Sequence, residues 1–219
     1  MKVNNKQLIQ KMTGVGVFSA LAFIVTLVCK LVPQVGGFLT LDAKDAVIAI
    51  ASFIYGPAVA PIIALIVAFV EFITISETGP WGLLMNFASS ATFSLTASLI
   101  YKFRKTLNGA IVGFAAATLL TTVVMITLNP FIIPMYSGVS REIVVSMIPS
   151  LLLPFNFAKT LINSAVAMLL YKPIMNACRA AGLVSKSQHK TAFNRNTVIT
   201  LSVSGAFLLA AIIILVLIW

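Results

Sequence analysis

The sequence has little charge, and very little of that charge is negative. Charged residues make up 9% of its 219 residues, and there are only five acidic residues and one histidine, His189. With a single histidine, the chain has no HExxH pair and no His-based catalytic triad within an apolar segment. It also has no GxxxxGK[ST] phosphate loop. We expect no enzyme, no bound metal and no cofactor, and if ATP drives this protein, another chain hydrolyses it.

Long apolar segments are what the sequence has in abundance. Hydrophobic residues make up 60% of the chain, and its mean hydropathy is +1.06. Because a bilayer core about 30 Å thick needs roughly 20 helical residues, these segments are long enough to cross it. They occupy residues 12–31, 43–75, 81–101, 107–128, 150–171 and 198–218. The two cysteines, Cys29 and Cys178, are too few for a disulfide framework. The sequence predicts an all-α, polytopic membrane protein.

The number of crossings depends on residues 43–75, which form either one long helix or two short ones. If the lysine-bearing N-terminus is cytoplasmic, an even number of crossings must bring the basic residues of 102–105 to the same side. We therefore expect the chain to reverse direction at Gly56-Pro57. Eleven basic and no acidic residues then face the cytoplasm. The net charge of +10 reflects membrane orientation, and we expect no nucleic-acid partner.

This topology divides the chain into four parts. We expect a cytoplasmic basic N-terminus at residues 1–11, a six-helix membrane domain at 12–178, a basic cytoplasmic linker at 179–197 and an extra transmembrane helix at 198–219. The last segment contains about 21 apolar residues without charge, enough for a further span. It receives no functional assignment from the sequence.

A binding site is expected near the short second helix. A helix from about residue 42 to 55 rises only about 20 Å and cannot cross the bilayer by itself. Short or broken segments in membrane proteins commonly border a cavity. The connections predicted to lie outside are also longer and richer in turn residues than the inner ones, and they cover residues 32–42, 76–82 and 129–149. We expect a site that opens to the exterior.

Segment 150–171 carries a polar stripe within an apolar span. Asn156, Lys159, Thr160 and Asn163 follow one another at positions i, i+3, i+4 and i+7, which lie on one face of a helix. The stripe either fixes helix packing through hydrogen bonds or forms part of a binding site. Lys159 favours a site, because an ionisable group within a span is costly unless it faces a partner or a wet cavity. A lysine one turn from the membrane surface is also able to snorkel.

Other polar and aromatic residues are expected near the outer membrane surface, at about the depth of Lys159. Glu71 either pairs with Lys159, directly or through a ligand, or lifts its carboxylate to the interface. Asn86 and Asn129 also lie near the exterior, the latter in an Asn-Pro pair that begins a loop. The aromatic residues form either an interfacial belt or a stacking surface, and they are Trp81, Phe131, Tyr136 and Phe155. This set suits a neutral, planar, heteroaromatic solute better than a bare ion.

Four motifs in the chain resemble one known family. They are Phe38-Leu-Thr-Leu-Asp42-Ala-Lys-Asp45, Ile54-Tyr-Gly-Pro57, Gly79-Pro-Trp-Gly-Leu-Leu-Met-Asn-Phe87 and Asn156-Phe-Ala-Lys159. Over about residues 10–178 the chain is similar to the riboflavin-binding S component of bacterial energy-coupling factor (ECF) transporters. The resemblance implies a six-helix subunit of the bacterial cell membrane that captures riboflavin from outside. It also implies a transmembrane T subunit and two ABC ATPase subunits as partners, with riboflavin as transported ligand.

The resemblance assigns roles to individual residues. By position, the ligand contacts fall on the first outer loop and three helices, at Phe38, Leu39, Thr40, Asp42, Asn86, Asn129, Asn156 and Lys159. We add Asn163 from the polar stripe. Coupling to the T subunit is assigned to a small-xxx-small pair on the first helix, Gly16 and Ala20, although the same pair also suits internal packing.

Two other functions remain open from the sequence. The chain is alternatively an S component for another vitamin, such as thiamine or pantothenate, which ligand competition would separate. It is also alternatively a stand-alone secondary transporter, which predicts uptake by this chain alone under an ion gradient.

Overall fold

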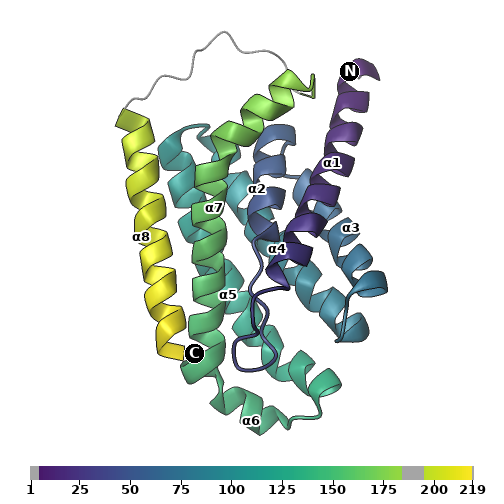
Figure 1. The fold of residues 1–219 in the computed structure, drawn as a ribbon, viewed down its shortest axis with the longest axis vertical. Coiled ribbons are helices and arrows are strands. Elements are labelled where there is room, and N and C mark those ends of the chain that lie inside the picture. The colour runs from purple at the N-terminus through teal and green to yellow at the C-terminus, as the bar shows by residue number, and fades with distance from the viewer. Residues whose placement is uncertain (1–4, 184–194, 219) are drawn as a thin grey trace.

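The chain is helical throughout the part that the structure describes. The computed structural model describes residues 5–183 and 195–218, and they contain helices and no strand (Figure 1). The helices are α1 (Asn5–Cys29), α2 (Lys44–Tyr55), α3 (Val59–Thr74), α4 (Gly79–Phe103), α5 (Leu107–Ser137), α6 (Arg141–Ser146), the π-helical turn η1 (Ile148–Leu152), α7 (Leu153–Ala180) and α8 (Arg195–Ile218). The six predicted helices are α1 to α5 and α7, and α8 is the predicted seventh. The predicted N-terminus 1–11 and linker 179–197 lie partly outside the described residues.

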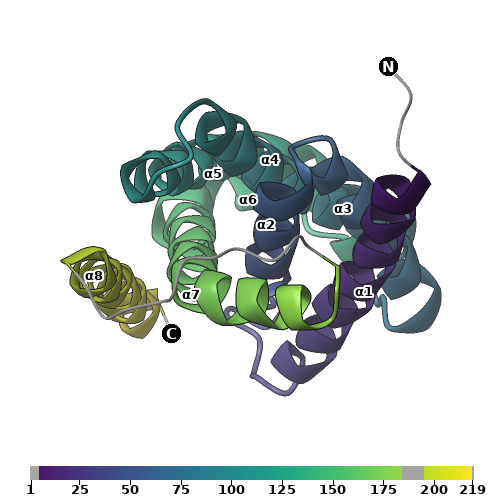
Figure 2. The same cartoon turned by 90° about the horizontal axis from the view of Figure 1, so that it is seen from above.

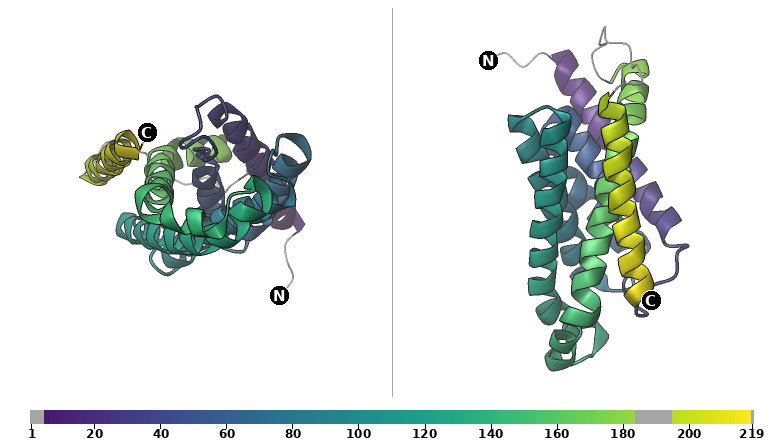
Figure 3. Two further views of the ribbon diagram at one scale, coloured as in Figure 1. Left: turned by 90° about the horizontal axis from the view of Figure 1, so that it is seen from below. Right: turned by 90° about the vertical axis from the view of Figure 1, so that its left-hand side faces the viewer.

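The bundle has two chemically different ends. One, which we call the basic end, holds the start of α1, the α2–α3 and α4–α5 turns and the end of α7, with Lys11, Lys102, Arg104, Lys105, Lys172 and Arg179 (Figure 1). The other, which we call the loop end, holds the connections 30–43 and 75–78 and helix α6 (Figure 3). All five acidic residues belong to the loop end, namely Asp42, Asp45, Glu71, Glu77 and Glu142.

Most of the helices are long and apolar enough to cross a membrane. Among the described residues these are Leu8–Cys29, Gly79–Phe103, Leu107–Ser137, Ile148–Ala180 and Thr197–Ile218. Helix α3 is shorter but apolar. Helix α2 has 12 residues, which rise only about 18 Å. The short second helix expected from the sequence is therefore present, and it requires protein around it.

Helix α2 lies at the centre of the bundle (Figure 2). Nine consecutive residues, from Lys44 to Ser52, are buried, so every face of this helix contacts protein. Its apolar side chains join one core with Phe18 of α1, Phe93 of α4 and Phe114 of α5. A helix that is buried all round does not need to match the thickness of the bilayer. The longer helices are able to span, and α2 fills the space between them.

The chain reverses direction between α2 and α3 at Gly56-Pro57, as the charge pattern predicts. Gly56 has φ 102°, a conformation that glycine adopts without a steric penalty. Its N–H donates to the carbonyl oxygen of Ser52 at 2.9 Å and so ends α2. Pro57 follows, and α3 begins at Val59. The reversal brings the α2–α3 turn to the basic end (Figure 1).

The predicted outer loop 129–149 is largely wrong. Helix α5 continues through Pro130 and Pro134 to Ser137 and ends before Gly138, which has φ 71°. Each proline removes one backbone donor, but within a membrane the remaining backbone groups are best satisfied inside a helix. Asn129 is consequently a buried helical residue. Helix α6 and η1, rather than an irregular loop, return the chain to α7.

Helix α8 packs along α7, on the side of the bundle away from α1 (Figure 2). Ser204 and Ala211 of α8 are fully buried. Ala211 packs with Ala158 and Leu161 of α7. The opposite face of α8 exposes large apolar side chains, such as Leu209 and Val216. Such a face suits contact with lipid.

Helices α4 and α5 approach closely at a glycine. A Cβ built on Gly113 would lie 2.8 Å from the carbonyl oxygen of Ala97, which belongs to the backbone of α4. Backbone cannot move aside as a flexible side chain can. Gly113 therefore sets the distance between the two helices, as small residues commonly do in membrane bundles.

We expect Gly113→Leu to destabilise the bundle by about 1–3 kcal/mol or more, because the new side chain overpacks the α4–α5 contact. Thermal unfolding of the purified protein in detergent, followed by intrinsic fluorescence, measures this. Gly205→Leu on α8 is the matched control, since no heavy atom lies within 4 Å of a Cβ at that position. Equal melting temperatures for the two variants would contradict this interpretation of the packing.

Candidate ligand-binding site

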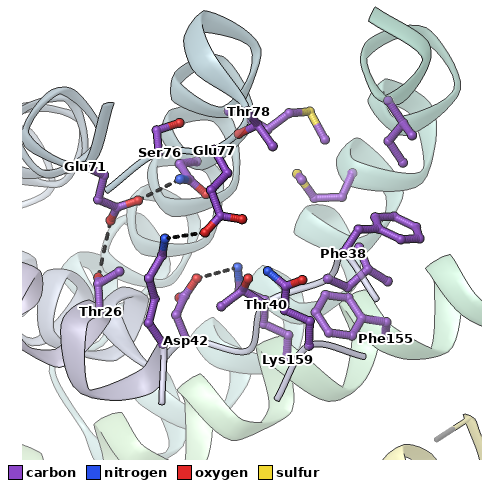
Figure 4. Close-up of a pocket in the computed structure, with 18 of the residues that line it drawn as sticks. Thr26, Phe38, Thr40, Asp42, Glu71, Ser76, Glu77, Thr78, Phe155 and Lys159 are labelled. Atoms are coloured by element: carbon purple, nitrogen blue, oxygen red, sulfur yellow. Dashed lines mark hydrogen bonds and ion pairs between the residues drawn. The ribbon is translucent and has the colours of Figure 1, made fainter. Parts of the chain in front are cut away.

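A cavity opens at the loop end of the bundle. Its volume is about 180 Å³, and Figure 4 shows its lining side chains converging from several elements. Loop 30–43 and the connection after α3 contribute, as do α1, α4, α5 and α7. Short α2 contributes Lys44 at its first residue. The cavity thus lies where the fold has its irregular connections, at the first residue of the short central helix α2.

Most of the residues that the sequence singles out line this cavity. They are Phe38, Leu39, Thr40, Asp42, Asn86, Asn129, Asn156 and Lys159. Asn163 is not among the lining residues. Its side chain is fully buried, accepts from the N–H of Ala46 at 2.8 Å and donates to the carbonyl oxygen of Asp42 at 2.8 Å. Asn163 therefore holds the junction between the loop and α2 in place beside the cavity.

An ion pair joins α7 to loop 30–43. The Nζ of Lys159 lies 2.9 Å from Oδ2 of Asp42, and both side chains are buried. Lys159 therefore does not snorkel to the surface. The pair fixes the end of the loop against the polar stripe of α7, directly on the cavity wall (Figure 4).

A second ion pair joins α2 to α3. The Nζ of Lys44 lies 2.7 Å from Oε1 and 2.9 Å from Oε2 of Glu71. Asn86 of α4 donates to Oε2 of Glu71 at 2.6 Å, and Thr26 of α1 donates to Oε1 at 3.3 Å. The Glu71 carboxylate thus collects hydrogen bonds from three further helices.

The direct pairing of Glu71 with Lys159 considered from the sequence is wrong. Each group has another partner of opposite charge, Lys44 for Glu71 and Asp42 for Lys159. Lys44 and Thr26 are among the cavity-lining residues that sequence reasoning missed. The signal for Lys44 was present, because it lies between Asp42 and Asp45 at the start of an otherwise apolar segment. Three charges there are costly unless they pair within the protein.

The two pairs form one chain of alternating charge. Lys44 also lies 3.8 Å from Oδ2 of Asp42, so the order is Lys159, Asp42, Lys44 and Glu71. Burial by itself would raise the pKa of Asp42, but the two adjacent lysines hold that pKa below its usual value. Asp42 is therefore a carboxylate at neutral pH, and the four buried charges sum to zero.

Two buried polar atoms on the cavity wall lack a partner among the described residues. They are Nδ2 of Asn129, a donor, and Oδ1 of Asp42, an acceptor. Asn129 is 3% exposed and Asp42 is 7% exposed. An unsatisfied buried polar atom is costly and is usually explained by a ligand or an ordered water. The cavity therefore offers one donor and one acceptor to a bound molecule.

The aromatic residues divide between the two uses considered from the sequence. Tyr136 and Phe155 line the cavity together with Phe38. Phe131 instead has 52% of its surface exposed, and the guanidinium of Arg141 lies over its ring at 4.3 Å. Trp81 is also exposed, at 39%. Three rings beside the cavity suit the flat faces of an aromatic ligand, and the two outer rings suit the membrane interface.

The described residues contain no group of three or more His, Cys, Asp and Glu that could hold a metal ion. The charged groups of the cavity instead neutralise one another. The cavity wall therefore presents hydrogen-bonding groups and aromatic rings. The predicted coupling residues lie elsewhere, because Gly16 and Ala20 are exposed on α1, and a Cβ on Gly16 would meet nothing within 4 Å.

We expect Lys44→Met to destabilise the protein by about 3–5 kcal/mol, since it leaves the Glu71 carboxylate buried without a cation. The double variant Lys44→Met/Glu71→Met removes both charges and should recover a large part of that loss. Thermal unfolding in detergent measures both variants. A double variant no more stable than Lys44→Met would show that the pair is not the source of the effect.

Three comparisons with known proteins agree with this geometry. A family model described as the substrate-specific component of ECF transporters matches residues 10–174. The riboflavin transporter RibU of Staphylococcus aureus (strain TCH60) is 32% identical over 179 residues, covering 78% of this chain and 94% of the relative. A solved structure of the S component of a bacterial ECF transporter has a TM-score of 0.65 and 32% identity, covering 80% of this chain and 98% of that one.

The matched region also explains where the chain departs from its relatives. It ends at residue 174, inside α7, so α8 lies outside it. Helices α2 to α5, and most of α1 and α7, lie within the matched region. The fold, the membrane-spanning helices and the sequence match together show that this chain belongs to the substrate-specific S components of ECF transporters.

Proposed function

We propose that this protein binds riboflavin in the cavity at the loop end. The observation that carries the proposal is the cavity itself, in which an unsatisfied donor and an unsatisfied acceptor lie beside three aromatic rings. The isoalloxazine ring system is flat and carries alternating donors and acceptors along one edge, so it matches both features. The 32% identity with a riboflavin transporter supports the same ligand.

The charges of the cavity favour a neutral vitamin. Lys159 and Lys44 are each paired with a carboxylate, and Lys30, the third lysine on the cavity wall, lies 3.5 Å from Oε1 of Glu77. The site therefore has no unpaired lysine for the carboxylate of pantothenate. Asp42 contacts both lysines, so its negative charge is already balanced and does not favour the cation of thiamine. Breaking either buried pair to bind a charged ligand would leave a charge uncompensated. Riboflavin is uncharged at neutral pH and requires no such exchange.

The ligand-contacting groups we propose are the loop residues Phe38, Leu39, Thr40 and Asp42, with Asn86, Asn129, Asn156 and Lys159. The Nδ2 of Asn156 donates to the carbonyl oxygen of Leu152 at 2.7 Å, which leaves its oxygen as the group available to a ligand. Asn163 supports the site by holding Asp42 in position. Cavity-facing carboxamides then provide both donors and acceptors.

We place the basic end in the cytoplasm and the loop end outside the cell. The support is the distribution of charge, since all five acidic residues belong to the loop end and the basic end has eight described Lys and Arg residues without an acidic one. The protein would thus capture riboflavin from the exterior. Uptake requires energy from partners, which we propose are a transmembrane T subunit and two ABC ATPase subunits.

We propose that α1 provides the contact with the T subunit through Gly16 and Ala20. Both residues are exposed, and the space above Gly16 is open. A pair of small residues four apart permits close approach of another helix. Internal packing, the alternative left open by the sequence, does not use these two positions in the described bundle.

Riboflavin binding is tested by fluorescence quenching with the purified protein. We expect Asn129→Ala and Asn156→Ala each to weaken binding by about 1–3 kcal/mol, because each removes a hydrogen bond in a buried site. The matched control is Asn108→Ala, since Asn108 lies exposed on α5 at the opposite end. Absence of riboflavin binding to the unaltered protein, or tighter binding of thiamine or pantothenate in competition, would refute the assignment.

The contact between α1 and the T subunit is tested separately, by measuring riboflavin uptake into cells. We expect Gly16→Leu/Ala20→Leu to retain riboflavin affinity but to lose uptake in cells that also express the T and ATPase subunits, because two large side chains prevent close helix contact. Gly205→Leu on α8 serves as the control at another open position. Full riboflavin uptake by this chain without the ATPase subunits would instead indicate a stand-alone transporter.

A further inference from the structure

A second cavity lies at the basic end, far from the candidate riboflavin site. Its volume is about 200 Å³, and residues of α5 and α7 form most of its wall, with Thr200 of α8 at one side. Helix α7 packs against both α5 and α8 (Figure 2). None of the residues that line this cavity lines the first one. It is therefore a separate feature of the fold.

The inner wall of this cavity is aromatic and rigid. Phe53 of α2 stacks on Tyr101 of α4, with 4.2 Å between the ring centroids. Phe114 of α5 and Tyr171 of α7 lie 5.3 Å and 6.2 Å from the Phe53 ring. The four rings pack together and all line the cavity. This surface suits an apolar chain.

Two lysines line the same cavity. Lys105 is exposed in the α4–α5 turn, and Lys172 belongs to α7. The Nζ of Lys172 donates to Oγ1 of Thr197 at 2.9 Å. That partner is neutral, so it holds the ammonium group in place without balancing its charge. Lys105 and Lys172 thus place two positive charges beside an apolar, aromatic wall.

The rest of the chain cannot neutralise these two lysines. All five acidic residues of the sequence belong to the loop end, at the opposite end of the bundle. The positive-inside rule explains why basic residues are found at this end. It does not explain why two of them line a cavity with an apolar interior. A negatively charged molecule from outside the chain would supply the missing charge.

The position of the cavity indicates what kind of molecule this is. Large apolar side chains in the same turns of α5 and α8 as the cavity-lining residues are exposed, among them Val112 at 58%, and Val198 and Leu201 at 48% and 50%. These side chains suit the hydrocarbon of a bilayer. The lysines lie at the end of the spans, where lipid headgroups are found. A molecule that reaches both regions has an apolar chain and an anionic head.

We propose that this cavity binds an anionic phospholipid. An acyl chain lies against the aromatic wall between α5 and α8, and the phosphate-bearing headgroup contacts Lys105 and Lys172. Basic pockets between transmembrane helices on the cytoplasmic side are suited to such headgroups. Because α8 lies outside the region matched by the family model, part of this site is specific to the extended chain. The bound lipid would fill the space between α8 and α5.

The test uses the full-length protein reconstituted in bilayers of equal parts phosphatidylglycerol and phosphatidylcholine, then extracted in mild detergent. Native mass spectrometry counts the lipids that stay bound. We expect phosphatidylglycerol to be retained in preference to phosphatidylcholine. Lys105→Gln and Lys172→Gln should each reduce this retention about fivefold, since each removes one charge from the headgroup contact.

Two further variants separate a built site from general surface charge. Lys102→Gln removes the same charge at the same end, but Lys102 does not line the cavity, so retention should not change. Ala110→Phe fills the cavity from α5 and should abolish retention without removing any charge. Riboflavin titration of each variant checks that the bundle is intact. Equal retention of the two lipids, or an equal loss with Lys102→Gln, would overturn the proposal.

Discussion

The structure depends on four buried charges that alternate in sign. Lys159 of α7, Asp42 of the first loop, Lys44 of α2 and Glu71 of α3 form a continuous chain with no net charge. Any one of them alone would be costly to bury, and together they compensate one another. Since each belongs to a different element, the chain of charges also fixes how those elements meet. The wall of the candidate riboflavin cavity is assembled by the same contacts.

This arrangement explains how a binding site can exist where the fold is least regular. Loop 30–43 packs Phe38 and Leu39 against the apolar cluster around Ile133. Lys159 and Asn163 also anchor its last residues through Asp42. The anchored loop closes one side of the cavity, and the central helix α2 provides the base from which it is held. Because the charges balance, the remaining donors and acceptors are available to an uncharged ligand. Helix α2 therefore fills the core of the bundle and also contributes Lys44 to the wall of the cavity.

The basic end of the molecule differs from the loop end in how its charges are balanced. There the basic residues have no acidic partners in the chain, since all the acidic residues are used at the loop end. The same asymmetry that orients the protein in a membrane leaves Lys105 and Lys172 open to an external anion. One end thus neutralises its own charge around the candidate riboflavin cavity, and the other has basic residues without acidic partners.

The sequence by itself predicted the membrane fold and the reversal at Gly56-Pro57. Of the nine ligand-site residues taken from the family resemblance and the polar stripe, eight line the cavity. The length of apolar segments and the distribution of Lys and Arg determine how a chain crosses the bilayer, and both can be counted along the sequence. Only the tertiary structure decided the pairing of Lys44 with Glu71, the position of Asn163 beside the cavity and the continuation of α5 through its prolines. Those outcomes depend on which helices become neighbours, and spacing along one helix does not contain that information.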